Sequence, residues 1–309
     1  MLKNRITLES RKEMTPYLEA FRHETSGLSF TSLYMWREEN DFEYEICGDY
    51  LCISAVSYLK SDNYSRFLMP PLPLSGSYDT KSLRECLLHM KEIFNANGSD
   101  FSVRLVPESI RAEIEKALPE MEWFDDRPNY DYVYDRKEIE ELRGKRFHAK
   151  KNYVNSFSKN YEYTYEDIDS SMADEIMDFI TFFVERKELN EEDRKLLLME
   201  EEATRDVFEN FEKAGFTGGA IRVDGNIVAI AVCGKTGNDT VVEHIEKANT
   251  DYRGLYPTML NELAKHLPEE IAYINGWIGK EKLTESAELY GKSPYGMYLK
   301  AVAQDKIRY

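Results

Sequence analysis

Hydrophobic and polar residues follow two periods along this chain, and these periods predict its strands and helices. Alternation over a short run predicts a half-buried strand, and apolar residues every three to four positions predict an amphipathic helix. The strands expected in the first half are 6–8, 42–47, 50–56, 64–69, 101–105 and 130–134. The helices expected there begin after a cap at Ser10, near Phe30, at Asp79 and at Pro107.

The second half repeats this order of elements after a long helical stretch. Its expected strands are 161–165, 219–223, 227–234, 240–247, 271–275 and 296–301, and its expected helices are 171–187, 191–213, 254–266 and 280–290. In each half a turn-forming sequence, Gly48-Asp49 or Asp224-Gly225-Asn226, separates two strands and predicts a hairpin. The shared order indicates an internal duplication.

This repeated order is similar to that of the Gcn5-related N-acetyltransferase (GNAT) fold. We therefore expect an α/β protein of the α+β type with two tandem GNAT-like (acyl-CoA N-acyltransferase-like) domains. Each is expected to hold a mixed central sheet flanked by helices. The expected domains are 1–140, which we interpret as structural, and 141–309, which begins with a basic linking helix and is the expected active copy.

Composition limits the partners of this protein. The chain has 309 residues, 42% of them hydrophobic, with 40 Lys and Arg against 57 Asp and Glu, for a net charge of −17. This length favours two domains, and the apolar content excludes disorder. Because so acidic a surface repels phosphate backbones, a polyanionic partner requires a local cluster of cations, and DNA is not expected.

Neither a membrane span nor a metal centre is predicted. The longest apolar run, 227–233, is far shorter than the roughly 18 residues of a spanning helix, and the polar start lacks a signal-peptide core. We therefore expect a cytoplasmic protein without an integral membrane segment. The cysteines show no metal-ligand spacing and are expected to be reduced thiols: Cys47, Cys52, Cys86 and Cys233.

The connection from the central strand to the next helix differs between the halves. Such a connection can hold a phosphate, because the backbone N–H groups of a helix start are unpaired. In the first half three prolines between Pro70 and Gly76 remove donors. In the second half Tyr252, Arg253 and Gly254 are candidate phosphate contacts. An ordinary strand-to-helix loop is the alternative.

The strand before this second loop carries ionisable residues where a buried sheet is usually apolar. Alternation places His244 and Glu246 on one face and Glu243 with Lys247 on the other. Glu246 is the expected catalytic base, with His244 or Glu243 as alternatives. A half-exposed strand with solvated charges is the other interpretation.

The segment 142–161 reverses the acidity of the chain. It contains no acid and six cations: Arg143, Lys145, Arg146, Lys150, Lys151 and Lys159. Together with Phe147, His148 and Tyr153, this pattern favours an anion such as a nucleotide, an RNA end or a lipid phosphate. The alternative is that the basic residues pair with neighbouring acids, namely Glu138, Glu140 and Glu141.

Three blocks of sequence together resemble a known family. They are Gly144-Lys145-Arg146-Phe147-His148-Ala149-Lys150-Lys151-Asn152-Tyr153 with Phe157 and Tyr161, His244-Ile245-Glu246-Lys247-Ala248 with Tyr252-Arg253-Gly254-Leu255-Tyr256, and Tyr273-Ile274-Asn275 with Leu289-Tyr290-Gly291-Lys292-Ser293. The resemblance is to the C-terminal domain family of bacterial phosphatidylglycerol lysyltransferases. Its membrane-bound members move an amino acid from aminoacyl-tRNA to a lipid hydroxyl, so the resemblance implies acyl or aminoacyl transfer.

The resemblance also implies that the basic helix and Lys292 contact anions. After Asn275, however, the chain departs from the family's usual Arg-Glu pair, which leaves the acceptor open. The main hypothesis is transfer from aminoacyl-tRNA or a similar donor to an amine or a hydroxyl, with Asn275, Tyr290 and Lys292 as the acceptor wall. A CoA-dependent N-acyltransferase with acyl-CoA as donor, and a non-catalytic module that binds an RNA end or a peptide, are the alternatives.

Overall fold

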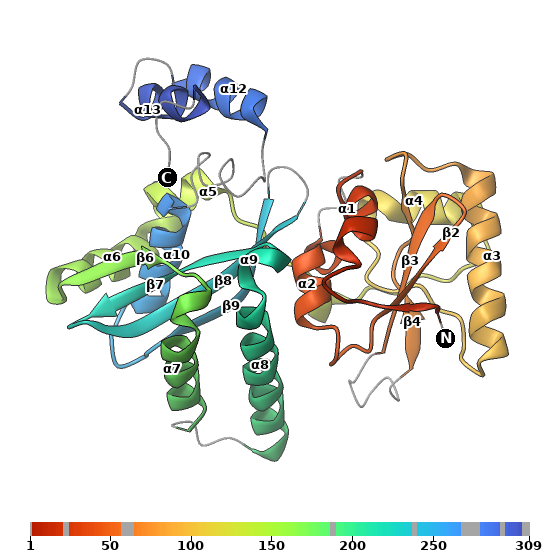
Figure 1. The fold of residues 1–309 in the computed structure, drawn as a ribbon, viewed down its shortest axis with the longest axis horizontal. Coiled ribbons are helices and arrows are strands. Elements are labelled where there is room, and N and C mark those ends of the chain that lie inside the picture. Colours follow the sequence, from red (N-terminus) through yellow and green to blue (C-terminus); the bar gives the residue numbers. More distant parts are fainter. Residues whose placement is uncertain are drawn as a thin grey trace. The chain divides into compact units, whose positions relative to one another are not determined.

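The computed structural model describes residues 2–20, 25–56, 65–185, 190–236, 240–266, 279–290 and 294–304. These residues form two units (Figure 1). The first unit comprises Met1–Tyr132, Lys187–Phe216 and Gly234–Val242, and the second comprises Val133–Arg186, Thr217–Cys233 and Glu243–Tyr309. Two segments of the second half of the chain therefore belong to the first unit.

The first unit contains an antiparallel sheet in the order β1-β2-β3-β4, with β5 also paired to β3. Its strands are β1 (Asn4–Arg5), β2 (Glu43–Cys47), β3 (Tyr50–Val56), β4 (Arg66–Leu68) and β5 (Leu72–Pro73). The predicted hairpin is confirmed, because Cys47 pairs with Tyr50 across the turn. β5 lies inside the proline-rich connection, so this loop adds a short strand before its helix.

The helices of the first unit are α1 (Arg11–Ala20), α2 (Phe30–Met35), α3 (Thr80–Ala96), α4 (Glu108–Ala117), α8 (Glu191–Glu209) and α9 (Phe211–Ala214). Asp79 caps α3, since its side chain accepts the amide of Ser82 at 2.8 Å. One stripe of α3, including Leu83, Leu87 and Met90, is fully buried. Short 3₁₀ turns lie at η1 (Ser26–Leu28) and η3 (Arg127–Asn129).

The second sheet has the order β6-β7-β8-β9. Its strands are β6 (Tyr163–Asp167), β7 (Phe216–Val223), β8 (Asn226–Thr236) and β9 (Thr240–Ala248). The associated helices are α5 (Arg136–Glu141), α6 (His148–Asn160), α7 (Ala173–Glu185) and α10 (Leu255–His266), with 3₁₀ turns η4 (Lys145–Phe147) and η5 (Ser170–Met172). α12 (Lys280–Tyr290) and α13 (Pro294–Ala303) pack against each other.

α6 and α10 lie side by side along one face of the second sheet (Figure 1). The core beneath them joins Phe157 of α6 and Met259 of α10 to Ala231 and Cys233 of β8 and to Ala248, the last residue of β9. Each of these side chains is completely buried. This core holds the basic helix against the end of the ionisable strand.

Four sequence expectations about strands are wrong. Residues 6–8 form no strand, because β1 ends at Arg5. Residues 130–134 form no strand, and Tyr132 and Val133 are more than four-fifths exposed, because their β-favouring side chains meet no neighbouring strand. Residues 296–301 lie in α13, which begins at Pro294, a residue suited to the first turn of a helix. Residues 101–105 supply only an isolated parallel bridge from Val103 to Leu68.

The sheets also differ from the mixed sheets that we expected, because the described strands of each sheet run antiparallel. The chain is therefore an α+β protein with two antiparallel sheets flanked by helices. The strand expected at 271–275 lies outside the described residues. Within the described part of the chain, no helix combines the length and apolarity that a bilayer crossing requires.

Candidate functional site

The ionisable residues of β9 lie beside the core that α6 and α10 cover. Ala248 faces this core. Side chains alternate between the two faces of a strand, so Glu246 and His244, two and four residues earlier, lie on the same face as Ala248. The pKa of the buried Cys233 thiol is raised by three causes. Burial has the largest effect, followed by the charge of Glu243 and then by the charge of Glu246. This effect indicates that Glu246 lies close to β8.

Glu246 is half-buried and lacks a hydrogen-bond partner at one oxygen. Its Oε1 atom is out of contact with water, and no donor in the described part of the chain reaches it. The pKa of Glu246 is raised to about 8, because burial and the charge of Glu243 raise it by more than the charge of Lys150 lowers it. A carboxyl with this pKa accepts and releases a proton near neutral pH.

The two other candidate bases are less suited to that chemistry. Burial lowers the pKa of His244 to about 3, so its ring is neutral at physiological pH and a weak base. Burial raises the pKa of Glu243 to about 7, although its side chain is exposed to solvent. Because water reaches Glu243 and stabilises its charge, Glu246 is the better candidate for a proton acceptor in a protein environment.

The basic segment is only partly neutralised by acids. Arg146 pairs with Glu138, and Arg143 lies 3.3 Å from the carboxylate of Glu141, as the alternative interpretation of this segment expects. By contrast, three lysines form no ion pair with any other described residue: Lys145, Lys150 and Lys151. The first turn of α6 contains no acid, although the positive end of the helix dipole favours one there. This excess of positive charge suits an anionic ligand.

Lys150 connects the basic helix to β9. It occupies the same stripe of α6 as Val154 and Phe157, four and seven residues later, both of which are buried. Lys150 is accordingly half-buried, whereas Lys145 and Lys151 are exposed. Its Nζ atom lies 4.8 Å from the centre of the Tyr134 ring, and its charge acts on Glu246. The structure therefore brings these two predicted residues together.

The β9–α10 loop also contacts α6. The guanidinium of Arg253 lies 5.6 Å from the centre of the exposed Tyr153 ring. Gly254 has a φ of +94°, and a Cβ atom at this position would lie 2.4 Å from the carbonyl oxygen of Tyr153. Gly254 thus has a packing requirement for glycine that does not depend on a phosphate.

Backbone hydrogen bonds occupy much of this loop. The amides of Tyr252 and Leu255 donate within it at 3.1 Å, and the amide of Asp251 donates to the side chain of Asn249 at 3.0 Å. Pro257, in the first turn of α10, has no N–H group. The loop consequently offers a phosphate fewer donors than its sequence predicted.

The sequence did not predict Tyr134 as a site residue. It also did not predict the hydrogen bonds that connect α10 to the end of α5. Asn261 of α10 donates to the carbonyl oxygens of Ile139 and Glu140, at 2.6 and 3.0 Å. These bonds satisfy the end of α5 and fix the segment that leads into η4. The β-rich residues around Tyr134 predicted a strand and so concealed a contact with the basic helix.

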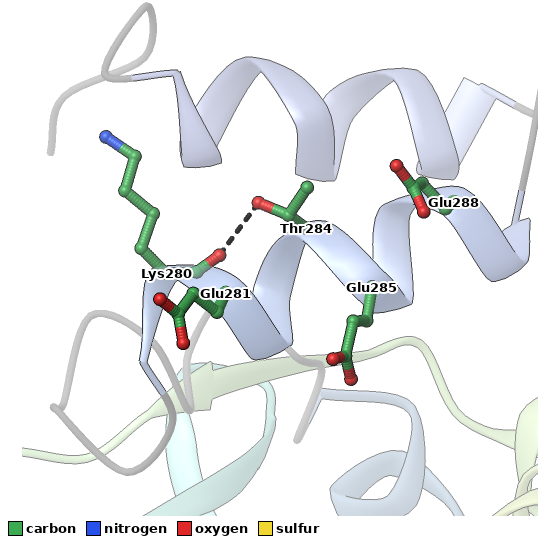
Figure 2. A pocket seen from close by; sticks show the side chains of 5 residues that line it. All are labelled: Lys280, Glu281, Thr284, Glu285 and Glu288. Carbon is green, nitrogen blue, oxygen red and sulfur yellow. Dashed lines mark hydrogen bonds between the residues drawn. The ribbon is translucent and has the colours of Figure 1, made fainter.

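The expected acceptor wall is not described. Asn275 and Lys292 lie outside the described residues, and Tyr290 ends α12 without a described side chain. A shallow hollow on α12 is lined by Lys280, Glu281, Thr284, Glu285 and Glu288 (Figure 2). All five come from one helix, so the hollow brings no second element to a ligand. Among the described residues, no group of three or more His, Cys, Asp or Glu side chains could hold a metal ion.

The fold and these side chains define an α+β protein in which a basic helix lies against an ionisable strand. The sequence matches the family described as phosphatidylglycerol lysyltransferase, C-terminal, over residues 18–292. The chain therefore belongs to this family, which confirms the predicted resemblance. Membership indicates a transferase family associated with aminoacyl transfer.

Two solved structures are similar to this chain, and the first of them supports the fold. The chain is similar to a conserved protein of unknown function from Bacteroides thetaiotaomicron VPI-5482, with 29% identity, a TM-score of 0.78, and coverage of 87% of this chain and 88% of that chain. It is also similar to a C-terminal domain from Agrobacterium fabrum described as belonging to a lysylphosphatidylglycerol synthetase, with 13% identity, a TM-score of 0.48, and coverage of 84% and 76%. A comparison with curated proteins gives no significant match.

Proposed function

We propose that this protein is an acyl or aminoacyl transferase that uses a phosphate-bearing donor such as aminoacyl-tRNA. The observation that carries the proposal is the position of Lys150, which is half-buried between the exposed Lys145 and Lys151 and acts electrostatically on Glu246. This position supports a site in which a cation for a donor phosphate lies near a carboxyl that titrates near neutral pH. Membership of the lysyltransferase family supports transfer chemistry.

In this proposal each group has one task. Lys145, Lys150 and Lys151 bind the donor phosphates, with Arg253 beside Tyr153 at the edge of the same helix. Glu246 accepts the proton of the acceptor as the acceptor attacks the ester carbonyl of the donor. The ester bond then breaks, and its oxygen leaves with a proton. The tandem GNAT-like architecture, with 1–140 as the structural domain and 141–309 as the active domain, is part of the same proposal.

The β9–α10 loop makes CoA the less favoured donor. A CoA pyrophosphate needs several backbone N–H groups at a helix start, whereas here Pro257 lacks one and the amides of Tyr252 and Leu255 donate within the loop. The lysines of α6 bind a phosphate backbone through charge and need no such amides. The observations therefore favour an RNA-linked donor over acyl-CoA.

The test follows labelled amino acid from tRNA. Purified full-length protein is incubated with tRNA charged with labelled amino acids and with small molecules extracted from its host. We expect label to move from the tRNA into a new product, and Glu246→Gln to slow this transfer by about 100-fold or more. Glu45→Gln, a paired carboxyl in the first sheet, serves as the matched control and should leave the rate unchanged.

The alternatives predict other results. Transfer from labelled acetyl-CoA in place of tRNA would identify a CoA-dependent N-acyltransferase. Salt-sensitive RNA binding that is equal in wild type and Glu246→Gln, without transfer from either donor, would identify a non-catalytic RNA-binding module. Either result would contradict the proposed reaction.

A further inference from the structure

Within the part of the chain that the structure describes, the Glu246 carboxyl lacks one of the hydrogen bonds that a buried carboxyl normally makes. Its Oε1 atom is buried without a hydrogen-bond partner among the described residues, while the side chain as a whole keeps some contact with solvent. Burying a carboxyl without partners is unfavourable, and a structural residue at this position would normally be paired or apolar. Because the residue as a whole is only half-buried, a ligand that reaches Glu246 can supply the missing partner.

The surroundings of Glu246 limit what this ligand can be. Lys150 lies near enough to oppose the rise in the pKa of Glu246, yet it forms no ion pair with this carboxyl. Instead, the Lys150 ammonium lies over the Tyr134 ring. A hydrogen-bond donor with positive charge compensates a buried carboxylate better than a neutral donor does. An anionic group would instead be repelled by Glu246 and attracted to the exposed lysines.

We propose that the incompletely paired carboxyl of Glu246 binds a primary amine of the acceptor, so that the transfer forms an amide. The role of this amine as the acceptor rests on the proposed function, whereas the amine site itself rests on Glu246 and its surroundings. The family members named above act on a lipid hydroxyl, so this chain would differ from them in its acceptor.

Proton balance agrees with an amine. The acceptor ammonium gives one proton to the Glu246 carboxylate, and the resulting amine forms a bond to the donor carbonyl carbon. The carbon–oxygen ester bond breaks, and the proton held by Glu246 passes to the departing oxygen. The nitrogen then loses its second proton through the freed Glu246 carboxylate to water, which leaves a neutral amide. An alkylammonium has a pKa of about 10, which is closer to the pKa of Glu246, about 8, than is the pKa of a hydroxyl, which resembles water at about 15.7.

The first experiment measures binding at Glu246 without any donor. Full-length protein with ¹³C-labelled glutamate carboxyls is titrated with n-butylamine and, separately, with 1-butanol, and the Glu246 signal is assigned by its loss in Glu246→Gln. We expect n-butylamine to shift this signal saturably and to lower the pKa of Glu246, and 1-butanol to do neither. Glu43→Gln, which removes a paired carboxyl of the first sheet, should keep the response. An equal response to both probes, or none, would overturn the amine site.

The second experiment separates this inference from the proposed function. The product formed from aminoacyl-tRNA is treated with mild alkali, which cleaves esters and spares amides. An alkali-stable product supports the amine acceptor. An alkali-labile product overturns it and leaves the transferase proposal standing. Saturable binding of n-butylamine at Glu246 without transfer from any donor supports the amine site and contradicts the transferase proposal.

Discussion

Each sheet of this protein holds a carboxylate that is at least half-buried, Glu43 in the first and Glu246 in the second, and the two differ in their hydrogen-bond partners. In the first sheet Glu43 is 6% exposed and accepts the amide of Leu2 at 2.8 Å, with Arg66 at 3.4 Å, while Glu45 pairs with Lys3. In the second sheet Glu246 has an oxygen that finds no partner in the described part of the chain. Buried charges that serve stability are paired, so the unpaired one is the better candidate for function.

The pKa values express the same difference. Burial alone raises the pKa of Glu43, but the hydrogen bond from Leu2 and the charge of Arg66 outweigh it, and the net pKa lies below the ordinary value. At Glu246 burial prevails and the pKa is about 8. Glu43 therefore stabilises the fold as an anion, whereas Glu246 can gain or lose a proton near neutral pH.

The largest expected effect is a loss of transfer activity when Glu246, but not Glu43, is replaced by glutamine. Glu246→Gln should reduce transfer by about 100-fold or more, because a positioned base contributes at least that factor, while Glu43→Gln should leave the rate of the folded protein unchanged. Initial rates at saturating donor measure both. Equal rates for wild type and Glu246→Gln would remove the catalytic assignment.

The next largest effect is the loss of stability when a glycine with a positive φ is replaced by alanine. Gly254→Ala should destabilise the protein by roughly 2–4 kcal/mol, because the new Cβ atom meets the Tyr153 carbonyl at a positive φ. Gly48→Ala, at the hairpin of the first sheet, has a φ of +59° but no atom within 4 Å of the new Cβ, and should cost about 1–2 kcal/mol. Urea denaturation checks both, and equal losses would show that Gly254 has no packing role.

Stability should fall on removal of the paired carboxyl. Glu43→Gln should lower the free energy of unfolding by roughly 1–3 kcal/mol at neutral pH, because Arg66 and the Leu2 amide lose an anionic partner. Thermal unfolding of Glu43→Gln beside wild type measures this loss. An unchanged midpoint would mean that the pairing in the first sheet contributes little.

The same carboxylates should give opposite dependences on pH. The folded pKa of Glu246 is raised, so its contribution to stability is present below about 4.5 and is lost as the pH rises through about 8. Glu246→Gln should therefore stabilise the protein at pH 9, on the order of 1–2 kcal/mol after allowance for partial exposure.

The folded pKa of Glu43 is lowered, so its contribution is present above about 4.5 and is lost as the pH falls through the lowered value. Denaturation curves at pH values from roughly 3 to 9 would measure how the free energy of unfolding changes as Glu43 and Glu246 titrate. A stability of Glu246→Gln that tracks wild type across the alkaline limb would contradict the raised pKa.

The smallest effect compares two lysines of α6. Lys150→Met should weaken binding to tRNA a few-fold and reduce the salt dependence of binding by about one unit of slope. Lys159→Met, about 13 Å further along the helix, should change neither, because Lys159 lies in the last turn. Filter binding across a salt series measures both variants, and identical slopes would argue against a phosphate contact at Lys150.

Much of the secondary structure was predictable from local pattern. The helix expected at 280–290 has the bounds of α12, and both hairpins form where two turn residues separate β-rich runs. The failures have one cause. Residues 130–134 and 296–301 carry β-favouring side chains, but whether such a run becomes a strand depends on a neighbouring strand that local pattern does not specify.

The candidate site was predictable in composition but not in arrangement. The alternation of β9 is local, so the shared face of His244 and Glu246 could be inferred. Arg146 is neutralised by Glu138, whereas Lys150 has no ion pair with any described residue. Both outcomes depend on how α5, η4 and α6 are oriented relative to one another. The sequence left these outcomes open.

By itself, the sequence determined the family, most helices and hairpins, and which residue types could handle a proton or an anion. The tertiary structure decided which of those residues share an environment. Charge and hydrogen-bond partners act over a few ångströms, so Glu246 and Lys150, almost a hundred positions apart, influence each other only because α6 packs on the sheet beside β9.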